Sequence, residues 1–252
     1  MDQTTITALN QLNRSFYDTV AEPFATTRQR PWQGWERVLS TLTSTIDLSG
    51  PISLLDLGCG NGRWGSFFID QTNSAECAYV GVDENRTLLQ YASRVLLPRT
   101  KVLYLYHQDI LSWIDAQEAA TRYDVVVLYG VWHHVPSAHL RGQLLEKLAS
   151  LLLPKGILII SCWRFLRSPA LQKRLISSES QGFSPEQLEE GDYFLDWQSG
   201  PTAIRYCHDT QPEELIHQAE DAHLRLIESF SADGKTGDLN EYYLFQRKQL
   251  LA

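Results

Sequence analysis

The sequence predicts an α/β fold with a doubly wound, mostly parallel sheet, helices on both faces and an antiparallel hairpin at the C-terminal edge. Three observations lead to this expectation. Short apolar or β-branched runs recur through the middle of the chain, helix-like segments separate them, and a loop rich in Gly and Asp joins the last two runs. Strands that are apolar along their whole length are typical of parallel sheets that helices cover on both sides.

The elements are expected in a regular order. Residues 31–46 should form a helix with Pro31 in its first turn, since Trp and aliphatic residues recur there at helical spacing. A capping-box pattern begins at Ser184, and a second one, beginning at Thr210, should open a helix that ends near Ala222. The expected strands are 52–56, 78–83, 102–107, 125–129, 157–162, 224–230 and 242–246, and the expected core helices are 63–71, 85–96, 110–119 and 138–153.

Composition narrows the class of protein. The chain has 252 residues, of which 43% are hydrophobic, which suffices for the core of a single domain. A net charge of −8 gives no global attraction to nucleic acid or anionic membranes. No apolar run reaches the length of about 18 residues that a membrane span needs. The N-terminus lacks the pattern of a signal peptide, so we expect a cytoplasmic protein with no membrane partner.

The stretch LLDLGCGNGRWG, at 54–65, is the strongest motif. An acid, Asp56, closes a strand, and Gly58, Gly60 and Gly62 follow before a helix begins. Glycines let the backbone turn with positive φ and approach a ligand, while the helix N-terminus offers free N–H groups. Asp83 ends the next strand, where a carboxylate can accept hydrogen bonds from both ribose hydroxyls of a nucleotide.

Two classes of nucleotide cofactor fit such a loop. The dinucleotide fingerprint needs a third small residue where this chain has Arg63. The order Asp-x-Gly-x-Gly-x-Gly instead resembles motif I of the class I S-adenosylmethionine methyltransferases, whose fold is Rossmann-like. This resemblance implies S-adenosylmethionine as cofactor and a single domain, divided into an N-terminal helical cap (1–50), a cofactor-binding core (51–163), a substrate-side insertion (164–209) and a closing helix and hairpin (210–252).

The same resemblance assigns roles to individual residues. Asp109 stands where the family places the acid that meets the adenine amino group, and Ile110 would stack nearby. Purely structural roles remain open, with Asp109 as a helix N-cap and Asp56 as an anchor of the loop. The expected cofactor-binding residues are Asp56, Gly58, Gly60, Gly62, Asp83, Asp109, Ile110 and Tyr129.

A second resemblance lies outside the core. Residues 15–32 match the pattern Y-x-x-x-A-x-x-F-x-x-T-R-x-x-P-W of the eukaryotic tRNA wobble-uridine methyltransferases, and VWHHVPS (131–137), GDYFLDWQ (191–198) and RYCH (205–208) parallel further segments of that family. The resemblance implies esterification of the carboxylate of 5-carboxymethyluridine. It also implies tRNA as partner, together with a small zinc-binding activator subunit.

This chemistry suggests an acceptor site. A carboxylate is already ionised at pH 7, so the enzyme must position and desolvate it but needs no general base. Arg28 could hold the acceptor carboxylate or that of the cofactor. His133 is expected to line the acceptor pocket as a hydrogen-bond donor, with His134 structural. The catalytic candidates are Arg28 and His133, and the substrate-binding candidates are Tyr17, Trp32, Trp163, Arg164, Trp197, Tyr206 and His208, although each aromatic side chain could equally be core.

No metal site is expected beside the two histidines. Ubiquinone-type O-methyltransferases resemble this segment but carry two carboxylates there, whereas residues 130–134 read Gly-Val-Trp-His-His. Zinc would need a third ligand, for which His208 is the obvious candidate. None of the four cysteines forms a C-x-x-C pair, so reduced thiols are expected.

Three hypotheses for function follow. The first is a carboxyl O-methyltransferase acting on tRNA. The second is a methyltransferase acting on a small carboxylic acid or phenol, since few spare cations are available to bind RNA. The third is a non-catalytic module that binds S-adenosylmethionine. A phenol would need a general base, whereas a carboxylate would not, so the role of the histidines separates two of the acceptors.

Overall fold

The computed structural model describes residues 1–252 apart from 73–75, 119, 199 and 249–252. Its main sheet has seven strands in the order β3-β2-β1-β4-β5-β10-β9. The first five of these strands are parallel, and β10 pairs antiparallel with both β5 and β9. The strands are β1 (Ser53–Leu57), β2 (Ala78–Asp83), β3 (Val102–His107), β4 (Tyr123–Leu128), β5 (Leu152–Trp163), β9 (Leu224–Ala232) and β10 (Asn240–Arg247). The predicted fold class and its closing hairpin are confirmed.

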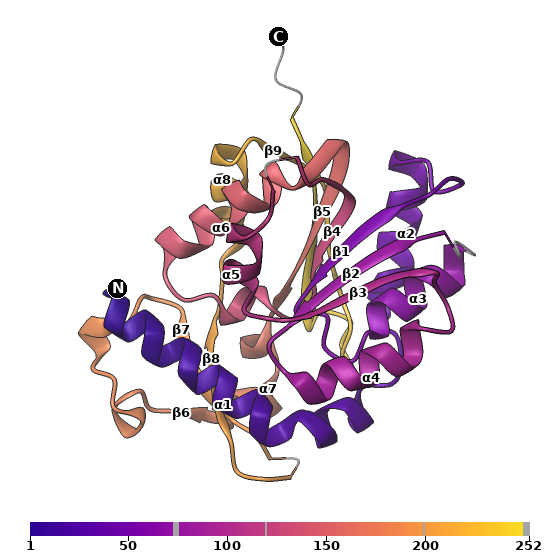
Figure 1. The fold of residues 1–252 in the computed structure, drawn as a ribbon. Coiled ribbons are helices and arrows are strands. Elements are labelled where there is room, and N and C mark those ends of the chain that lie inside the picture. Colours follow the sequence, from indigo (N-terminus) through magenta and orange to yellow (C-terminus); the bar gives the residue numbers. More distant parts are fainter. Residues whose placement is uncertain (73–75, 119, 199, 249–252) are drawn as a thin grey trace.

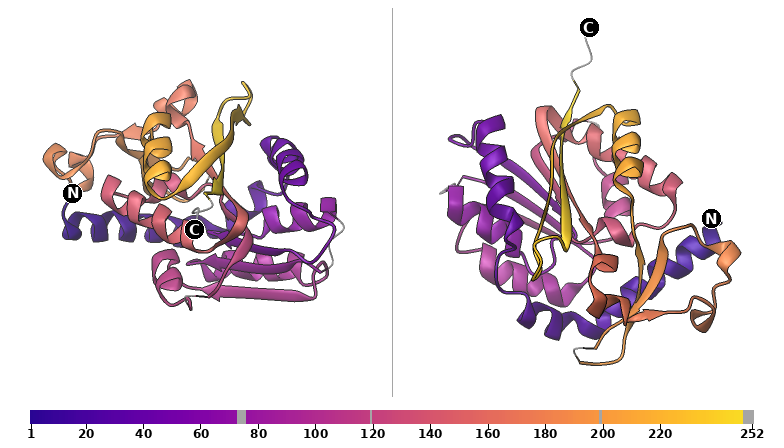
Figure 2. Two further views of the ribbon diagram at one scale, coloured as in Figure 1. Left: turned by 90° about the horizontal axis from the view of Figure 1, so that it is seen from above. Right: turned by 180° about the vertical axis from the view of Figure 1, so that it is seen from behind.

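Helices cover both faces of this sheet, as expected for strands that are buried along their length. One face packs against α5, α6 and α8, and the other packs against α2, α3 and α4. Figures 1 and 2 show these two layers from the front and from behind. The bounds are α2 (Gly34–Thr45), α3 (Arg63–Thr72), α4 (Arg86–Leu96), α5 (Ile110–Asp115), α6 (Ala138–Ser150) and α8 (Pro212–Asp221).

Several predicted boundaries differ from the structure. Helix α2 begins at Gly34, so Pro31 precedes the helix and does not occupy its first turn. Strand β5 begins five residues before the expected start because it runs through Pro154 and Lys155 from Leu152. Helix α5 ends at Asp115, and the expected extension reaches residue 119, which lies outside the described residues. The pattern at Thr210 forms no capping hydrogen bond, since Gln211 is the N-cap of α8.

The insertion between β5 and α8 forms a second, smaller sheet. Its antiparallel strands β6 (Leu175–Ile176), β7 (Asp192–Asp196) and β8 (Ile204–His208) are ordered β6-β7-β8. A four-residue helix, α7 (Pro169–Gln172), precedes them, and short 3-10 turns η2 (Phe165–Arg167), η3 (Glu179–Gln181) and η4 (Pro185–Gln187) connect the segment. The capping box predicted at Ser184 is present on η4.

Helix α1 (Gln3–Thr27) connects this small sheet to the core. Its N-cap Asp2 accepts a hydrogen bond from the backbone N–H of Thr5, and its buried face includes Leu9, Phe16 and Val20. It packs against β8 and α4 and crosses below the carboxyl ends of the main strands (Figure 1). The 3-10 turn η1 (Trp132–His134) follows β4 at the same end of the sheet. These elements enclose the space in which a ligand can lie.

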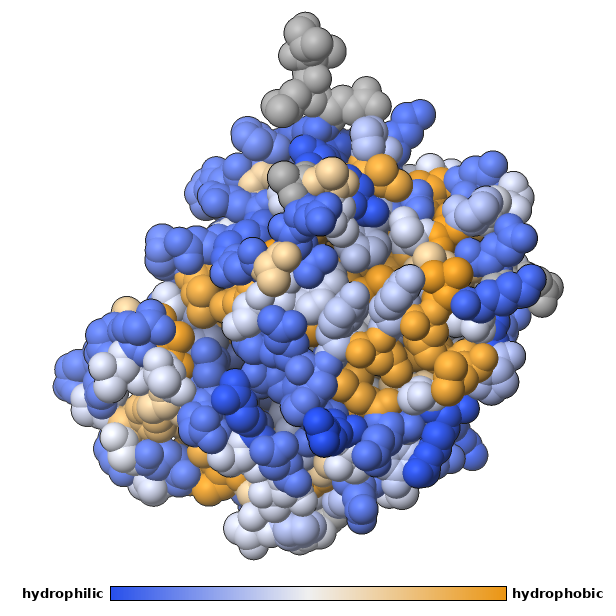
Figure 3. All heavy atoms as spheres, viewed as in Figure 1, coloured by the Kyte–Doolittle hydropathy of each residue, from blue (hydrophilic) through white to orange (hydrophobic). Residues whose placement is uncertain are grey.

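Strand β3 is one of the two edges of the main sheet. Val102, Tyr104 and Tyr106 on this strand, and Leu97 just before it, are the large hydrophobic side chains exposed in the described part of the chain. Figure 3 shows apolar surface over the same region. Among the described residues, no helix combines the length and apolar character that crossing a membrane requires.

Candidate active site

A pocket of about 510 Å³ lies between α1 and the carboxyl ends of β1, β2, β3 and β4. This is the edge at which open α/β sheets bind their ligands. Two contacts hold α1 over it, since Arg14 pairs with Glu84 at 2.6 Å and Asn85 donates to Asp18 at 3.0 Å. The predicted site residues that line the pocket are Tyr17, Arg28, Trp32, Asp56, Gly58, Gly60, Asp83, Asp109, Ile110 and Tyr129.

The three glycines of the loop serve different purposes. All three have positive φ, between 54° and 73°. A side chain at Gly58 would collide with Val131, and one at Gly62 would collide with Ala92 of α4, whereas the space beside Gly60 is open. Gly62 therefore allows α3 to pack against α4 and does not line the pocket, while Gly60 leaves the backbone accessible to a ligand.

Asp83 is fixed in place by the loop that it faces. Its two carboxylate oxygens accept hydrogen bonds from the backbone N–H groups of Gly60 and Asn85, both at 2.8 Å. Burial raises the pKa of Asp83 to about 6. Each oxygen retains a lone pair for a further donor, which suits ribose hydroxyls. Asp109 caps α5 through Ser112 N–H at 2.8 Å and also lines the pocket, so its two proposed roles are compatible.

One end of the pocket contains polar atoms without partners. Asp56 is buried, accepts a hydrogen bond from the Tyr79 hydroxyl at 2.6 Å, and has its pKa raised by burial to about 7. Four pocket-lining residues carry a buried donor with no hydrogen-bond partner among the described residues: Tyr129 Oη, Trp35 Nε1, Trp64 Nε1 and Arg63 Nε. Unpaired buried donors are costly, so their gathering here fits a ligand with a carboxylate and an amino group. The amino-acid end of S-adenosylmethionine has both groups.

His134 lies at the other end of the pocket, against Tyr17 and Tyr206. Its Nδ1 is 2.8 Å from the carbonyl oxygen of Tyr206, which can only accept, and 3.2 Å from the amide nitrogen of Asn13, so the shorter contact assigns the proton to Nδ1. Nε2 must then accept from the Tyr17 hydroxyl, which is 2.9 Å away. Burial lowers the pKa of His134 to about 3. The ring is therefore neutral at physiological pH, and its basic nitrogen is already occupied.

The structure places His134, not His133, among the lining residues, which corrects the expected order of the two. His133 is 5% exposed, its ring is 5.3 Å from that of Trp163, and its Nδ1 has no hydrogen-bond partner among the residues that the structure describes. Ligand atoms of His133, His134 and Cys207 lie within 4.8 Å of one another, so Cys207 takes the third place that had been considered for His208. Both nitrogens of His134 are engaged, and the positive charge of Arg205 acts on both histidines and repels a cation, so this cluster is poorly suited to a metal ion.

Two guanidinium groups beside this end of the pocket have no carboxylate partner in the described part of the chain. Arg28 lies 3.9 Å from the ring centre of Phe24 and 5.3 Å from that of Trp197, and burial lowers its pKa to about 10. Arg205, on β8, is 7% exposed, lies 4.3 Å from the ring of Trp163, and has an unpartnered Nε. Its charge acts on Tyr17, Arg28 and both histidines, although it is outside the lining itself. The sequence pointed to Arg205 only as part of the segment RYCH (205–208) and gave it no role of its own.

The remaining predicted substrate residues do not line the pocket. Trp197 packs on Phe16, and Trp163 lies behind the lining against His133 and Arg205. Arg164 is buried in ion pairs with Glu241 at 2.7 Å and Asp209 at 3.4 Å. The Tyr206 hydroxyl and His208 Nδ1 both bond to Asp192. These side chains support the site from outside it.

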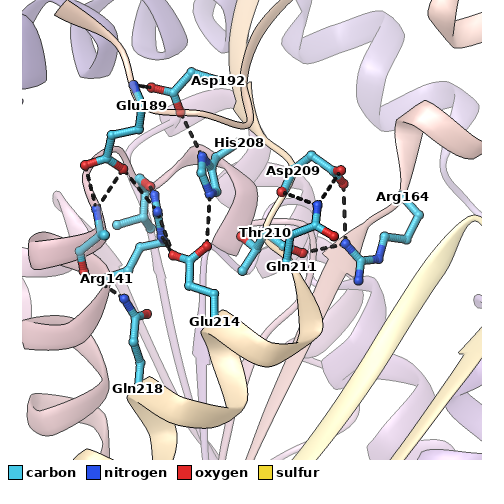
Figure 4. A network of polar contacts seen from close by, with 12 residues as sticks. Arg141, Arg164, Glu189, Asp192, His208, Asp209, Thr210, Gln211, Glu214 and Gln218 are labelled. Carbon is cyan, nitrogen blue, oxygen red and sulfur yellow. Dashed lines mark hydrogen bonds and ion pairs between the residues drawn. The ribbon is translucent and has the colours of Figure 1, made fainter.

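His208 belongs to a network that holds the insertion against the core (Figure 4). It contacts Asp192 of β7 and Glu214 of α8, at 2.8 Å and 3.4 Å. Arg141 of α6, which is 1% exposed, pairs with Glu189 and Glu214 at 3.2 Å and 2.7 Å. Although burial opposes the charged form, the hydrogen bonds to the two acids raise the pKa of His208. The network fixes β8, whose Tyr206 carbonyl orients His134.

The comparisons of this chain with a family model and with solved structures agree with each other. A family model described as "Methyltransferase domain" matches residues 24–229. Among solved structures, an S-adenosylmethionine-dependent methyltransferase from Clostridium acetobutylicum aligns with a TM-score of 0.64 at 12% identity, over 93% of this chain and 97% of that one. A 1,6-didemethyltoxoflavin-N1-methyltransferase from Burkholderia thailandensis, solved with 1,6-didemethyltoxoflavin and S-adenosylhomocysteine, aligns with a TM-score of 0.61 at 15% identity, over 94% of this chain and 87% of that one. At such identities the structures show the fold alone.

Three curated proteins that are similar to this chain in sequence carry the same enzyme description. The chain is 25% identical over 147 residues to a tRNA (carboxymethyluridine(34)-5-O)-methyltransferase of Arabidopsis thaliana, over 58% of this chain and 31% of that protein. A protein of the same description from Schizosaccharomyces pombe is 23% identical over 188 residues, covering 75% and 68%. A third tRNA (carboxymethyluridine(34)-5-O)-methyltransferase, from Mus musculus, is 24% identical over 176 residues, which are 70% of this chain and 22% of that protein. The chain thus spans a third or less of the plant and mouse relatives.

Proposed function

We propose, from the premise that this chain belongs to the methyltransferase-domain family, that it methylates a carboxylate on a modified wobble uridine of tRNA. Membership makes the chain an S-adenosylmethionine-dependent methyltransferase. The identity of the acceptor is the step beyond that premise. It draws on the likeness to three tRNA (carboxymethyluridine(34)-5-O)-methyltransferases and on the charge of the pocket.

The observation that carries the proposal is the pair Arg28 and Arg205. Arg205 is buried and Arg28 is partly buried, both act on Tyr17, and neither has a carboxylate partner in the described part of the chain. A buried cation without a counter-ion is costly, and an anionic ligand relieves that cost. A guanidinium binds a carboxylate through two parallel hydrogen bonds, which also fixes its orientation. The site therefore favours an acidic acceptor.

The protonation state of His134 favours a carboxylate over a phenol as the methyl acceptor. A phenol, with a pKa of about 10, must lose a proton to attack a methyl group, so it needs a general base. His134 has a pKa of about 3, and its Nε2 already accepts from Tyr17. A nitrogen this weakly basic takes up no proton near pH 7. A carboxylate arrives ionised, so this arrangement is compatible with it.

The chain contributes mainly position and exclusion of water. S-adenosylmethionine, when bound, supplies an electrophilic methyl group, and an acceptor oxygen that bonds to this carbon displaces the neutral thioether, with no proton transferred. Asp83 and Gly60 would hold the nucleoside part, and Asp56 with the unpaired donors around Tyr129 would hold the amino-acid part. Arg28 would orient the acceptor oxygen. Trp32 and Phe24 line the pocket with apolar surface, which strengthens these charge interactions by keeping water away.

The test uses labelled cofactor and two sources of acceptor. Purified protein is incubated with S-adenosylmethionine labelled on its methyl group and either bulk tRNA from cells lacking the gene or a small-molecule extract of the same cells. Label in a nucleoside digest of the tRNA, lost on mild alkaline treatment that hydrolyses esters, is the expected result. Label only in small molecules would overturn the tRNA proposal.

One observation favours a second candidate, a small carboxylic acid as acceptor. The net charge is −8, whereas affinity for RNA depends on contacts between cations and phosphates. The small-molecule arm of the same experiment tests it directly. Binding of S-adenosylmethionine without transfer in either arm would support a non-catalytic binding module. The zinc-binding activator subunit stays a prediction, and copurification of a zinc-containing protein from the native source would support it.

A further inference from the structure

A second groove, of about 410 Å³, adjoins the pocket between the end of α1 and helices α3 and α4. Arg28, Asn61 and Arg63 line both cavities, so the groove is continuous with the pocket at these residues. On the far side, Arg99 and Tyr91 complete its wall. A ligand that extends out of the pocket past these shared residues would lie in this groove.

The groove is basic within an acidic protein. Its lining holds three arginines, Arg28, Arg63 and Arg99, and a single acid, Asp70, which is bonded to Arg99 at 3.0 Å. Two exposed arginines border it. Arg30 lies between the lining residues Gln29 and Pro31, and Arg94 has its guanidinium carbon 5.6 Å from the ring centre of Tyr91.

Arg63 shows that this charge is not neutralised within the described residues. Its Nη1 donates to the carbonyl oxygen of Arg30 at 2.9 Å, its Nε has no partner, and its guanidinium lies 5.1 Å from the ring of Trp35. Burial, and then the charge of Arg28, lower the pKa of Arg63 to about 10. Two cations that repel each other across a shared wall are stabilised when an anion binds between or beside them.

We infer that this groove binds the phosphodiester backbone of the RNA strand that carries the acceptor nucleotide, an inference that rests on the proposed function. The nucleotide to be methylated would lie in the pocket, and the flanking phosphates would contact Arg30 and Arg94 at the rim of the groove. Arginine side chains suit phosphate oxygens, and Tyr91 offers an aromatic face beside them. A basic groove confined to one face explains how an acidic chain could engage RNA at the pocket while the rest of its surface repels it.

The experiment compares two double variants that each remove two exposed positive charges. The groove variant is Arg30→Gln with Arg94→Gln, and the matched control is Arg37→Gln with Arg225→Gln, on α2 and β9 away from the groove. Neither residue of the groove pair lines the pocket. Methyl transfer to bulk tRNA, KM for tRNA and kcat are measured, together with tRNA affinity across a range of salt concentrations.

We expect the groove variant to raise KM for tRNA about tenfold while kcat changes less than twofold. The slope of log affinity against log salt should fall by about one for each lost phosphate contact. KM for S-adenosylmethionine and turnover of free 5-carboxymethyluridine nucleoside, assayed at high concentration, should match wild type. The control should resemble wild type throughout.

The outcomes separate the groove from the function. If wild type methylates tRNA and the groove variant matches the control, the groove assignment is overturned and the proposed function stands. Equal losses in both double variants would indicate a general effect of charge, which also overturns the groove. If wild type transfers no label to tRNA, the proposed function fails and the groove proposal fails with it.

Discussion

The hydroxyl oxygen of Tyr17 lies 2.9 Å from Nε2 of His134, and the carbonyl of Tyr206 holds the opposite nitrogen of the same ring at 2.8 Å. The imidazole is therefore fixed as one neutral tautomer between α1 and β8. Because the Tyr17 proton points toward His134, the lone pairs of Tyr17 face elsewhere and the ring has no free basic nitrogen. Tyr17 and His134 therefore hold each other in position, and their contact joins α1 to the small sheet.

Tyr17→Phe tests this positioning role. The variant leaves His134 Nε2 buried without a donor, a loss worth about 1 kcal/mol. We expect kcat/KM for the methyl acceptor to fall about fivefold and the affinity for S-adenosylmethionine to stay unchanged, as measured by steady-state transfer and calorimetry. Tyr104→Phe, an exposed change on β3, is the control. A fall of about a thousandfold, in a variant that also loses a pH dependence present in the wild type, would instead make Tyr17 or His134 a proton acceptor.

The core of the fold could be read from the sequence because its strands are buried on both faces. The run 78–83 was predicted with its observed bounds, since parallel strands between helices leave a continuous apolar signal. The small sheet was missed. Its strands β7 and β8 have only five residues each, and buried and half-buried positions do not alternate along them. No period-two pattern therefore distinguishes these antiparallel strands from a loop.

Sequence reasoning placed those site residues whose positions follow from their own strand end or loop. It missed those whose positions depend on contacts between distant segments. Asp83 and Gly60 lie in contact because a strand end and a glycine loop share one sheet edge. Which of His133 and His134 lines the pocket depends on a 3-10 turn, which directs adjacent side chains to different sides. No periodicity in the sequence reveals such a turn. Arg205 reaches the site only because β8 lies against α1.

Arg28→Lys tests the acceptor grip. A lysine keeps the charge but loses the planar pair of donors and the stacking on Phe24. A charge-assisted hydrogen bond is worth about 2 kcal/mol, so kcat/KM for the acceptor should fall about thirtyfold. If Arg28 instead holds the cofactor, the loss will appear in KM for S-adenosylmethionine. Arg37→Lys, at an exposed ion pair on α2, supplies the comparison, and wild-type kinetics for Arg28→Lys would refute both roles.

Asp83 should make cofactor binding depend on pH. Its pKa in the free protein is about 6, so the carboxylate is ionised above pH 6 and loses its charge as the pH falls through that value. Ribose hydroxyls donate more strongly to the ionised form. We expect affinity for S-adenosylmethionine, measured by calorimetry, to decline below pH 6 and to be about a hundredfold weaker in Asp83→Ala at pH 8. Asp56, with a pKa of about 7, titrates in the same window, so Asp83→Asn should remove only the lower step.

His208→Gln should destabilise the protein most at low pH. The raised pKa of His208 means that its folded state binds a proton more tightly than the unfolded chain does, because Asp192 and Glu214 accept from the charged ring. That stabilisation is complete below the unfolded pKa of about 6.5 and is lost as pH rises through the higher folded value. We expect urea unfolding to show a deficit of about 2 kcal/mol at pH 6 that narrows by pH 9. His217→Gln, an exposed change on α8, should show no deficit at either pH. A deficit in His208→Gln that is equal at both pH values would mean that the neutral ring supplies the stabilisation.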